Sequence, residues 1–232
     1  MKIALIGDIH GNADALEAVL TCASERGVDF YLITGDLVGY YYQPKRVVEI
    51  VRDLPGVAVR GNHEDMLFRC QTSATERALV RSKYGAGIDV ALDILAESDL
   101  QWLRALPKSR EIDLGGRTLL LAHGAPWDTD VYIYPDAASD VWARLADLDA
   151  EIIVLGHTHY QFDTEISKTM VINPGSVGQP RDRKPGAAWS LLDTRRMKVS
   201  HFRAQYDTQP LIEEARQRDP HLPYLQTVLT RR

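Results

Sequence analysis

The feature that most constrains this chain is an apolar stretch that ends abruptly in a glycine and two metal-binding residue types. Residues 3–6 are all apolar, and Gly7, Asp8, Ile9 and His10 follow. Side chains two residues apart on an extended chain point the same way, so Asp8 and His10 share a face at the end of the predicted strand. By itself this segment fits either half of a metal site or a turn whose Asp caps the next helix. The same pattern recurs four more times along the chain.

Length and composition predict one soluble domain spanning residues 1–232. The chain is 45% hydrophobic and 25% charged, as is ordinary for a globular protein that buries a substantial core. Its formal charge of −5 argues against bulk binding to nucleic acid or to an anionic membrane surface. The apolar segments are too short for a signal-peptide core or a membrane span, and the two cysteines form no CxxC pair. We therefore expect a cytoplasmic protein, with its oligomeric state left open.

The first 65 residues alternate between strand and helix patterns. Residues 14–26 carry apolar side chains on one helix face, with Asn12 as a candidate cap, and residues 30–33 form the next apolar run. A second helix opens at Pro44, and a third strand covers residues 57–59. This alternation predicts a parallel sheet with helical crossovers. In such sheets functional groups gather at the carboxyl ends of the strands, which is where the glycine-flanked polar residues stand.

The rest of the chain reads as helices followed by many short strands. Residues 65–106 read as helical, with a capping signal at Ser98 for the last helix. A two-glycine turn at Gly115 and Gly116 joins the strands of a hairpin over residues 111–122. The remaining predicted elements are a helix at 138–148, strands at 152–155, 161–166, 169–172, 187–193 and 197–205, and a helix near 210–217 before a Pro-rich tail.

The histidines are distributed in a way that packing does not explain. Of seven histidines, five stand in glycine-flanked turns at predicted strand ends. These are His10, His63, His123, His157 and His159. The other two, His201 and His221, fit an ordinary sheet position and a tail position. Five imidazoles gathered at strand ends with Asp8 and Asp36 indicate a metal site.

Taken in order, these strand-end blocks resemble the signature of the calcineurin-like metallophosphoesterases. The matching blocks are Gly7-Asp8-Ile9-His10-Gly11, Gly35-Asp36, Gly61-Asn62-His63-Glu64, His123-Gly124 and Gly156-His157-Thr158-His159. The loop at residues 173–181 resembles the one in the small bacterial and archaeal phosphodiesterase branch. The resemblance implies an α/β (α+β) fold, a four-layer αββα sandwich of two mixed β-sheets flanked by helices. It covers most of the chain.

The resemblance also implies a binuclear metal centre. Asp8, His10 and His159 would hold one ion, Asn62, His123 and His157 the other, and Asp36 would bridge the two. Two divalent ions bring four positive charges and the two aspartates cancel two, so the centre would attract an anionic phosphate. Mixed nitrogen and oxygen ligands without thiolate suit Mn, our first choice, or Fe, Ni, Co or Zn, better than Mg.

By the same resemblance, His63 is not a ligand but the catalytic acid that protonates the leaving oxygen. An acidic neighbour, Glu64 or Asp65, would hold its imidazole in position and favour the protonated form. The alternative role for Glu64 is that of a first-turn acid stabilising the helix dipole.

One departure from the family pattern concerns substrate binding. Protein phosphatases and diadenosine tetraphosphatases of this superfamily carry Asp-Arg-Gly shortly after the bridging aspartate, whereas residues 39–41 here are Gly-Tyr-Tyr. The missing arginine argues against both activities. Tyr40 and the two tyrosines after it would either line a wall for a base or aromatic leaving group, or be ordinary core residues. Trp127 leaves the same two alternatives, and Arg181 or Arg183 would supply the missing positive charge.

We therefore expect a metal-dependent phosphoesterase, specifically a phosphodiesterase acting on a small phosphorylated or nucleotide substrate through a metal-activated hydroxide. The alternatives are a phosphomonoesterase or Ser/Thr protein phosphatase, and a non-catalytic binding scaffold of the same fold. The complete set of expected ligands and the presence of His63 argue against the scaffold.

Overall fold

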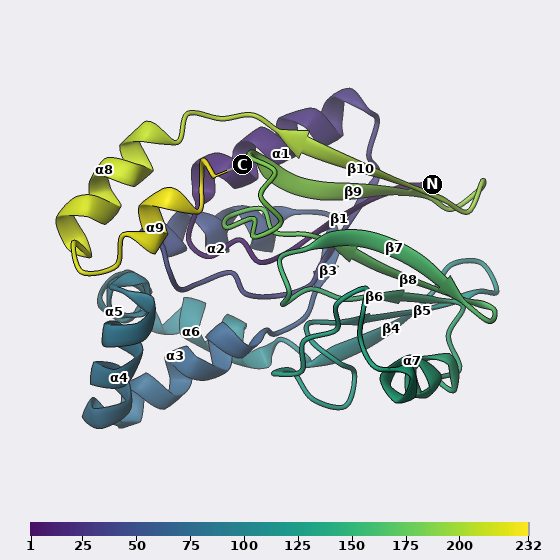
Figure 1. The fold of residues 1–232 in the computed structure, drawn as a ribbon, viewed down its shortest axis with the longest axis horizontal. Coiled ribbons are helices and arrows are strands. Elements are labelled where there is room, and N and C mark those ends of the chain that lie inside the picture. The colour runs from purple at the N-terminus through teal and green to yellow at the C-terminus, as the bar shows by residue number, and fades with distance from the viewer. Residues whose placement is uncertain (232) are drawn as a thin grey trace.

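The computed structural model describes residues 1–231 and contains two mixed five-stranded sheets (Figure 1). The strands of the first sheet are β1 (Lys2–Ile6), β2 (Phe30–Ile33), β3 (Gly56–Ala58), β9 (Ala187–Asp193) and β10 (Lys198–Ala204). They lie in the order β10-β9-β1-β2-β3. β1 and β3 run parallel to β2, as the alternation of strands and helices predicts, whereas β9 is antiparallel to β1.

The second sheet combines a hairpin with a parallel core. Its strands are β4 (Ser109–Asp113), β5 (Thr118–Ala122), β6 (Ile152–Val154), β7 (Gln161–Ile166) and β8 (Thr169–Pro174), in the order β4-β5-β6-β8-β7. β6 is parallel to both of its neighbours, while β4 and β7 at the edges are antiparallel to theirs. The predicted hairpin is present as β4 and β5.

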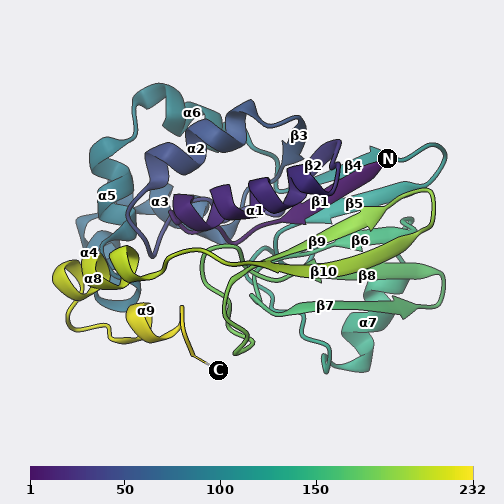
Figure 2. The same cartoon turned by 90° about the horizontal axis from the view of Figure 1, so that it is seen from above.

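The helices cover the sheets and gather at one end of them. They are α1 (Ala13–Glu25), α2 (Pro44–Asp53), α3 (Asn62–Thr72), α4 (Ala74–Tyr84), α5 (Gly87–Ile94), α6 (Glu97–Ala105), α7 (Ser139–Ala146), α8 (Gln209–Arg218) and α9 (Tyr224–Thr227). In both views α3–α6, α8 and α9 lie together at the end toward which β1 runs from the N-terminus (Figure 1, Figure 2). The carboxyl ends of the central strands therefore face this group of helices.

Alternation along the strands builds the four expected layers. Ile3 and Leu5 of β1 are fully buried between the sheets, against Leu121 and Val154 of the second sheet and their neighbours. The residues between them, such as Ala4, face a second core that contains the apolar stripe of α1. A third core lies between the outer face of the second sheet and α7. The fold is thus an αββα sandwich, with the central strands of each sheet buried on both faces.

Two of the differences from the sequence-based expectations concern helices. The chain after α8 forms a short helix, α9, where a tail was expected. α6 begins at Glu97 with Ala96 as its N-cap, so the cap predicted at Ser98 is wrong; the side chain of Asp99 accepts from the Ala96 main-chain N–H at 3.0 Å instead. In the part of the chain that the structure describes, the helices are all too short or too polar to cross a membrane.

Candidate metal centre

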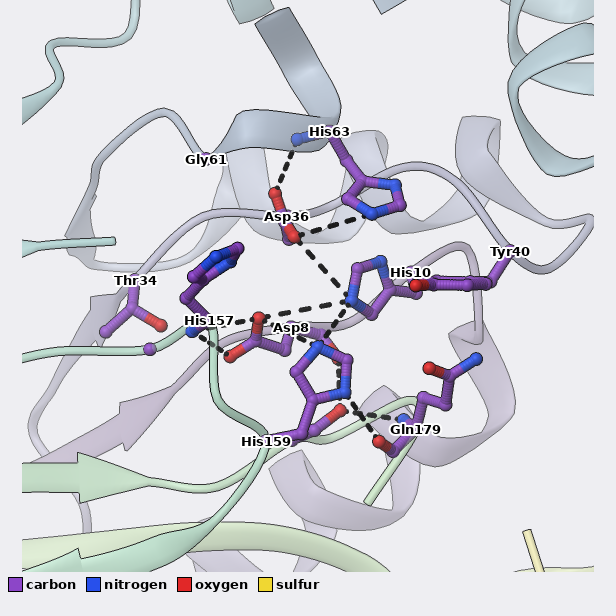
Figure 3. Close-up of polar contacts among 12 residues, drawn as sticks. Asp8, His10, Thr34, Asp36, Tyr40, Gly61, His63, His157, His159 and Gln179 are labelled. Carbon is purple, nitrogen blue, oxygen red and sulfur yellow. Dashed lines mark hydrogen bonds and ion pairs between the residues drawn. The ribbon is translucent and has the colours of Figure 1, made fainter. Parts of the chain in front are cut away.

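The proposed ligands come from the ends of five strands and meet in one place (Figure 3). Asp8 and His10 follow β1, Asp36 follows β2, Asn62 opens α3 after β3, His123 follows β5, and His157 and His159 follow β6. The carboxylates and imidazoles of this set are at most 4% exposed, and Asn62 is half-buried. The close-up shows Asp8 and Asp36 with the rings of His10, His157 and His159 around them. Residues far apart in sequence are therefore brought together as expected.

Asp8, His10 and His159 form a first group. The Nε2 atoms of His10 and His159 are 3.0 Å apart, and His159 Nε2 is 3.3 Å from Asp8 Oδ1. The main-chain N–H of His157 holds Asp8 in place, because it donates to both carboxylate oxygens, at 3.2 Å to Oδ1 and at 3.1 Å to Oδ2. Ligand atoms of Asp8, His10 and His159 thus lie close enough together to hold one ion.

A second group surrounds His123. Its Nε2 lies 3.0 Å from Asn62 Oδ1 and 3.1 Å from His157 Nδ1. Oδ2 of Asp36 is 3.4 Å from His123 Nε2 and 3.7 Å from His10 Nε2, so this oxygen faces both groups. The main-chain N–H of His63 donates to the other oxygen of Asp36 at 2.8 Å. Asp36 is the residue of the set that stands between the two groups.

The outer nitrogen of each of these four imidazoles points at a main-chain carbonyl. His10 Nδ1 lies 3.2 Å from the oxygen of Val38, His123 Nδ1 2.8 Å from that of Thr34, His159 Nδ1 2.7 Å from that of Gln179, and His157 Nε2 3.3 Å from that of Asp130. A carbonyl oxygen can only accept, so each outer nitrogen carries the ring's hydrogen. The inner nitrogens of the neutral rings are therefore lone-pair acceptors, the form in which imidazole binds metals.

The resulting arrangement fits bound cations. The inner nitrogens of His10 and His159 face each other at 3.0 Å, and those of His123 and His157 face each other at 3.1 Å. Both nitrogens of each pair are acceptors, so no hydrogen lies between them. An added proton is disfavoured, because burial lowers the pKa of His10 and His159, and lowers that of His157 to about 3. Burial alone would raise the pKa of Asp8, but the neighbouring histidines, His159 first, hold it at about 2. Acceptors facing one another in this way need a positive ion among them.

The main chain at the site is held in an uncommon conformation. Most of the proposed ligands have positive φ, in the left-handed region that residues with side chains seldom adopt. They are Asp8 (50°), His10 (53°), Asp36 (54°), His157 (67°) and His159 (60°). Each such residue costs roughly 1–3 kcal/mol and persists because its surroundings enforce it. The backbone therefore leaves the regular strand conformation where these residues enter the site.

Two glycines allow the strand ends to approach the carboxylates. A Cβ at Gly61 would lie 2.1 Å from Asp36 Oδ1, and one at Gly156 would lie 2.9 Å from Asp8 Oδ2. Neither contact is sterically allowed, so the glycines in these motifs are needed for space beside the two aspartates.

His63 is placed differently from the other four histidines. Its Nε2 is 4.0 Å from Asp36 Oδ2, and its ring lies against those of His10 and Tyr40, with centroids 4.6 and 4.8 Å apart. Its Nδ1 is buried without a hydrogen-bond partner among the described residues, so no carbonyl fixes which nitrogen carries the hydrogen. Burial and the neighbouring histidines lower its pKa. His63, His10 and Asp36 also lie close enough to share an ion, so proximity alone does not separate His63 from the ligands.

Glu64 does not hold His63, and the contact that we expected between them is replaced by another. Both carboxylate oxygens of Glu64 accept main-chain N–H groups, from Asp36 and Gly61 at one oxygen and from Leu37 and Val38 at the other. Asp65 instead forms an ion pair with Arg60 at 3.0 Å. Glu64 thus fixes the loop that carries Asp36 and, through the main-chain N–H of Gly61, caps the start of α3 as a first-turn acid, rather than holding the imidazole of His63.

The tyrosines after Asp36 are core residues and form no stacking wall. Tyr40, Tyr41 and Tyr42 are 6%, 0% and 5% exposed. The ring of Tyr40 packs edge-on to His10, with centroids 4.7 Å apart, and its hydroxyl accepts from the guanidinium of Arg181 at 2.9 Å. Arg181 also donates to Gln179 Oε1 at 3.2 Å. Tyr40 therefore stands between Arg181 and the proposed ligand His10, and Arg181 is held by hydrogen bonds to Tyr40 and Gln179. Trp127 packs against Arg144, whose Cζ lies 3.9 Å from the centroid of the indole ring.

Sequence reasoning missed the groups that orient the ligands. The carbonyls of Thr34, Val38 and Asp130 carry no signal in their side chains, so the sequence offered no way to find them. Gln179 lies in the loop at residues 173–181 that resembles the phosphodiesterase branch, and that resemblance was the available signal.

Comparison with known proteins decides the family. Residues 1–197 match the model of the calcineurin-like phosphoesterase superfamily domain. The chain belongs to this superfamily. The match spans every proposed ligand and confirms the resemblance noted in the sequence, the fold class and the expected enzyme class, a metal-dependent phosphoesterase.

Relatives extend over nearly the whole chain. An uncharacterized protein of Methanocaldococcus jannaschii is 31% identical over 230 residues, covering 91% of this chain and 90% of its own length. The phosphodiesterase YfcE of Escherichia coli is 24% identical over 204 residues, covering 83% and 88%. Among solved structures, a metallophosphoesterase from Sphaerobacter thermophilus superposes with a TM-score of 0.81 at 29% identity, covering 100% of this chain and 99% of its own. This calcineurin-like protein therefore shares its architecture, including the region after residue 197, with a metallophosphoesterase.

Proposed function

We propose that this phosphoesterase is a binuclear phosphodiesterase for a small phosphorylated or nucleotide substrate. The observation that carries the proposal is that two groups of inward-facing acceptor atoms meet at Asp36. Asp8, His10 and His159 would hold one divalent ion, and Asn62, His123 and His157 the other. The nitrogen-rich, thiolate-free donor set favours Mn, with Fe, Ni, Co or Zn as alternatives.

The charge of the centre suits an anionic substrate. Two divalent ions with Asp8 and Asp36 leave two positive charges, since the remaining ligands are neutral. When bound, such ions activate water and stabilise the charge that develops on the phosphoryl oxygens. Arg181, with most of its surface buried behind Tyr40, adds a fixed positive charge at the edge of the site. This supports Arg181 as a phosphate-binding residue, with Tyr40 as the residue that positions it.

His63 is suited to transfer a proton to the leaving oxygen. Its ring lies beside His10 and near Asp36, and no carbonyl commits its nitrogens to one tautomer among the described contacts. Burial favours the neutral ring, but an anionic phosphoester beside it favours the protonated one, so the substrate itself would charge the acid. Protonating the leaving oxygen avoids release of an alkoxide, which matters most for poor leaving groups.

Two observations favour a diester over a monoester. Residues 39–41 are Gly-Tyr-Tyr where the superfamily's protein phosphatases carry Asp-Arg-Gly, and the relative YfcE is named a phosphodiesterase. A monoester carries one more negative charge than a diester and gains more from that missing arginine.

The proposal is tested with one diester and one monoester that share a leaving group. Metal-stripped protein is reloaded with Mn, Fe, Co, Ni or Zn singly and assayed on methyl p-nitrophenyl phosphate and p-nitrophenyl phosphate. We expect turnover of the diester to depend on metal and to exceed that of the monoester in kcat/KM. Failure to hydrolyse either ester with any metal would contradict the proposal, and a preference for the monoester would favour a phosphomonoesterase.

A further inference from the structure

The proposed reaction gives no role to three tyrosines beside the metal centre. Tyr132, Tyr134 and Tyr160 lie together: the rings of Tyr132 and Tyr134 are parallel within 5°, with centroids 5.9 Å apart, and Tyr134 meets Tyr160 edge-on at 5.3 Å. We call this group the tyrosine platform. Tyr132 is 47% exposed and Tyr160 38% exposed, which places them among the most exposed large apolar side chains of the described residues. The platform therefore presents aromatic surface to solvent.

The platform is attached directly to the metal ligands. The ring of Tyr132 lies against that of His157, with centroids 3.9 Å apart, and Tyr160 follows His159 in the chain. The carbonyl of Asp130, two residues before Tyr132, accepts the outer hydrogen of His157. A group bound on Tyr132 would thus be separated from the metal centre by the ring of Tyr132 and the imidazole of His157.

The local chain holds these rings outward rather than leaving them loose. Ile133, between Tyr132 and Tyr134, is 2% exposed and belongs to the core under the second sheet. Neither flanking tyrosine belongs to this core: Tyr132 is exposed and Tyr134 is partly exposed, so both face away from it. Tyr40, Tyr41 and Tyr42, the aromatic residues that the sequence suggested for stacking, are buried, so the platform supplies the open aromatic surface that those residues do not.

The chemistry of this surface selects a flat, uncharged partner. Its members offer π faces and hydroxyl groups and carry no charge at neutral pH, whereas the phosphate is attracted by the metal centre and Arg181. Aromatic rings stack on planar groups with little dependence on their identity, as tyrosines do on nucleobases. Aromatic surface left in water next to a reactive centre marks a binding site more often than chance exposure does.

We propose that the tyrosine platform binds a planar aromatic group of the substrate, a nucleobase or an aryl ring, while its phosphate lies at the metal centre. This deepens the proposed function and rests on it for the placement of the phosphate. Tyr132 is the inner position, because it contacts His157, and Tyr134 and Tyr160 extend the surface outward. Substrates that lack a ring would bind through the phosphate alone.

The test measures binding of matched ligands that differ by the ring. Dissociation constants are determined by calorimetry on Mn-loaded protein for adenosine 5′-monophosphate against ribose 5-phosphate, and for phenylphosphonate against methylphosphonate. We expect at least one ring-bearing ligand to bind about 10-fold more tightly than its partner, the usual scale of one aromatic stacking contact. The first pair reports a nucleobase and the second an aryl ring. Equal affinities within both pairs would overturn the inference.

Variants assign the preference to the platform. Tyr132→Leu should remove most of the preference and Tyr132→Phe, which keeps the ring, should retain it. Tyr160→Leu tests the outer part without touching His157, in case Tyr132→Leu lowers the metal content, which is measured in each variant. Ile94→Ala, which trims an apolar side chain on α5 that is 47% exposed like Tyr132, is the control and should keep the preference. A preference that survives both Leu changes in the platform would contradict the assignment.

The outcome is separable from that of the proposed function. Turnover of methyl p-nitrophenyl phosphate by wild type tests the reaction, and the ligand pairs test the platform. Turnover without a ring preference would overturn the platform alone, whereas a ring preference without turnover would leave the platform and contradict the reaction.

Discussion

At the scale of residues, the direction of each imidazole ring distinguishes its role. His10, His123, His157 and His159 each direct one nitrogen to a main-chain carbonyl and the other inward. This fixes the tautomer and orientation that a metal ligand needs. His63 has no such carbonyl partner in the described chain, although it is buried in the same place. A ring whose tautomer is not fixed can change its proton during a reaction, which is what a general acid must do.

We predict that His63→Gln separates chemistry from metal binding. The variant should retain its metal, because the other ligands are untouched, and should lose about 10²–10⁴-fold in kcat on a diester with an alkyl leaving group. The loss should be much smaller on methyl p-nitrophenyl phosphate, because nitrophenolate leaves without help. Elemental analysis accompanies both assays. Loss of metal would make His63 a ligand, and full activity on the alkyl ester would exclude it as the acid.

We predict that Asp36→Asn impairs the site more than Asn62→Ala. Asp36 faces both groups of ligands, and its replacement removes a negative charge from between two cations, whereas Asn62 contributes a neutral oxygen to one group. Metal content and kcat should both fall further in Asp36→Asn. Asp163→Asn, an aspartate 47% exposed on β7, serves as the control and should leave both unchanged. Normal metal content in Asp36→Asn would show that Asp36 is not a bridging ligand.

The sequence predicted which residues meet, but not what each neighbour does. The side chains at the glycine-flanked strand ends meet as expected, since parallel strands bring their carboxyl ends to one edge. Glu64 and Tyr40 differed because their roles depend on contacts that are distant in sequence. Glu64 binds the main chain of residues 36–38, and Tyr40 faces a guanidinium 141 residues away. No local pattern contains that information.

At the scale of elements, regular alternation was predictable and helix ends were less so. β2, β7 and β9 match the expected ranges residue for residue, because turn residues bound their apolar runs clearly. The start of α6 was misplaced because Asp99, the third residue of the helix, accepts from the main-chain N–H of the N-cap Ala96 and so starts the helix before Ser98. Its carboxylate also binds Lys45 at 2.8 Å and Arg52 at 3.1 Å, both on α2. Thus a tertiary contact selects the helix start.

We predict that Asp99→Asn weakens the junction between α2 and α6. The side chain is 2% exposed and accepts from two cations and one main-chain N–H, so the change should lower the free energy of unfolding by about 1–3 kcal/mol at neutral pH. Urea unfolding measures it. Glu49→Gln, which removes the exposed partner of Lys45, is the control and should cost about 0–1 kcal/mol.

The pH dependence of this contact has a definite sign. Burial would raise the pKa of Asp99, but the hydrogen bond from Lys45 and the other donors hold it below its usual value. A depressed folded-state pKa adds stability above the unfolded value, near 4, and that stability is lost as the pH falls through the folded value. The difference between wild type and Asp99→Asn should therefore shrink below about pH 4. A difference that is constant from pH 7 to pH 3 would contradict this account.

At the scale of the whole molecule, the segment after the family match covers one end of the site. α8 and α9 pack on the tyrosines that follow Asp36: the hydroxyl of Tyr41 donates to the carbonyl of Leu225, and that of Tyr42 donates to Asp219. Arg231 donates to the carbonyl of Arg181 at 3.0 Å. The C-terminal segment thus supports the loop carrying Tyr40 and the position of Arg181 (Figure 1). The sequence indicated a helix and a tail here, but nothing in it showed where they dock.

The central claim is that the two groups of inward-facing ligand atoms hold two cations that share Asp36. Anomalous diffraction tests this claim most directly. Protein stripped with chelator and reloaded with Mn is crystallised, and an anomalous difference map is calculated near the Mn absorption edge. We predict two peaks, one among Asp8, His10 and His159 and one among Asn62, His123 and His157, both in contact with Asp36. A single peak, a second peak held by His63 in place of the expected ligands, or no peak at Mn concentrations that saturate activity would contradict the account.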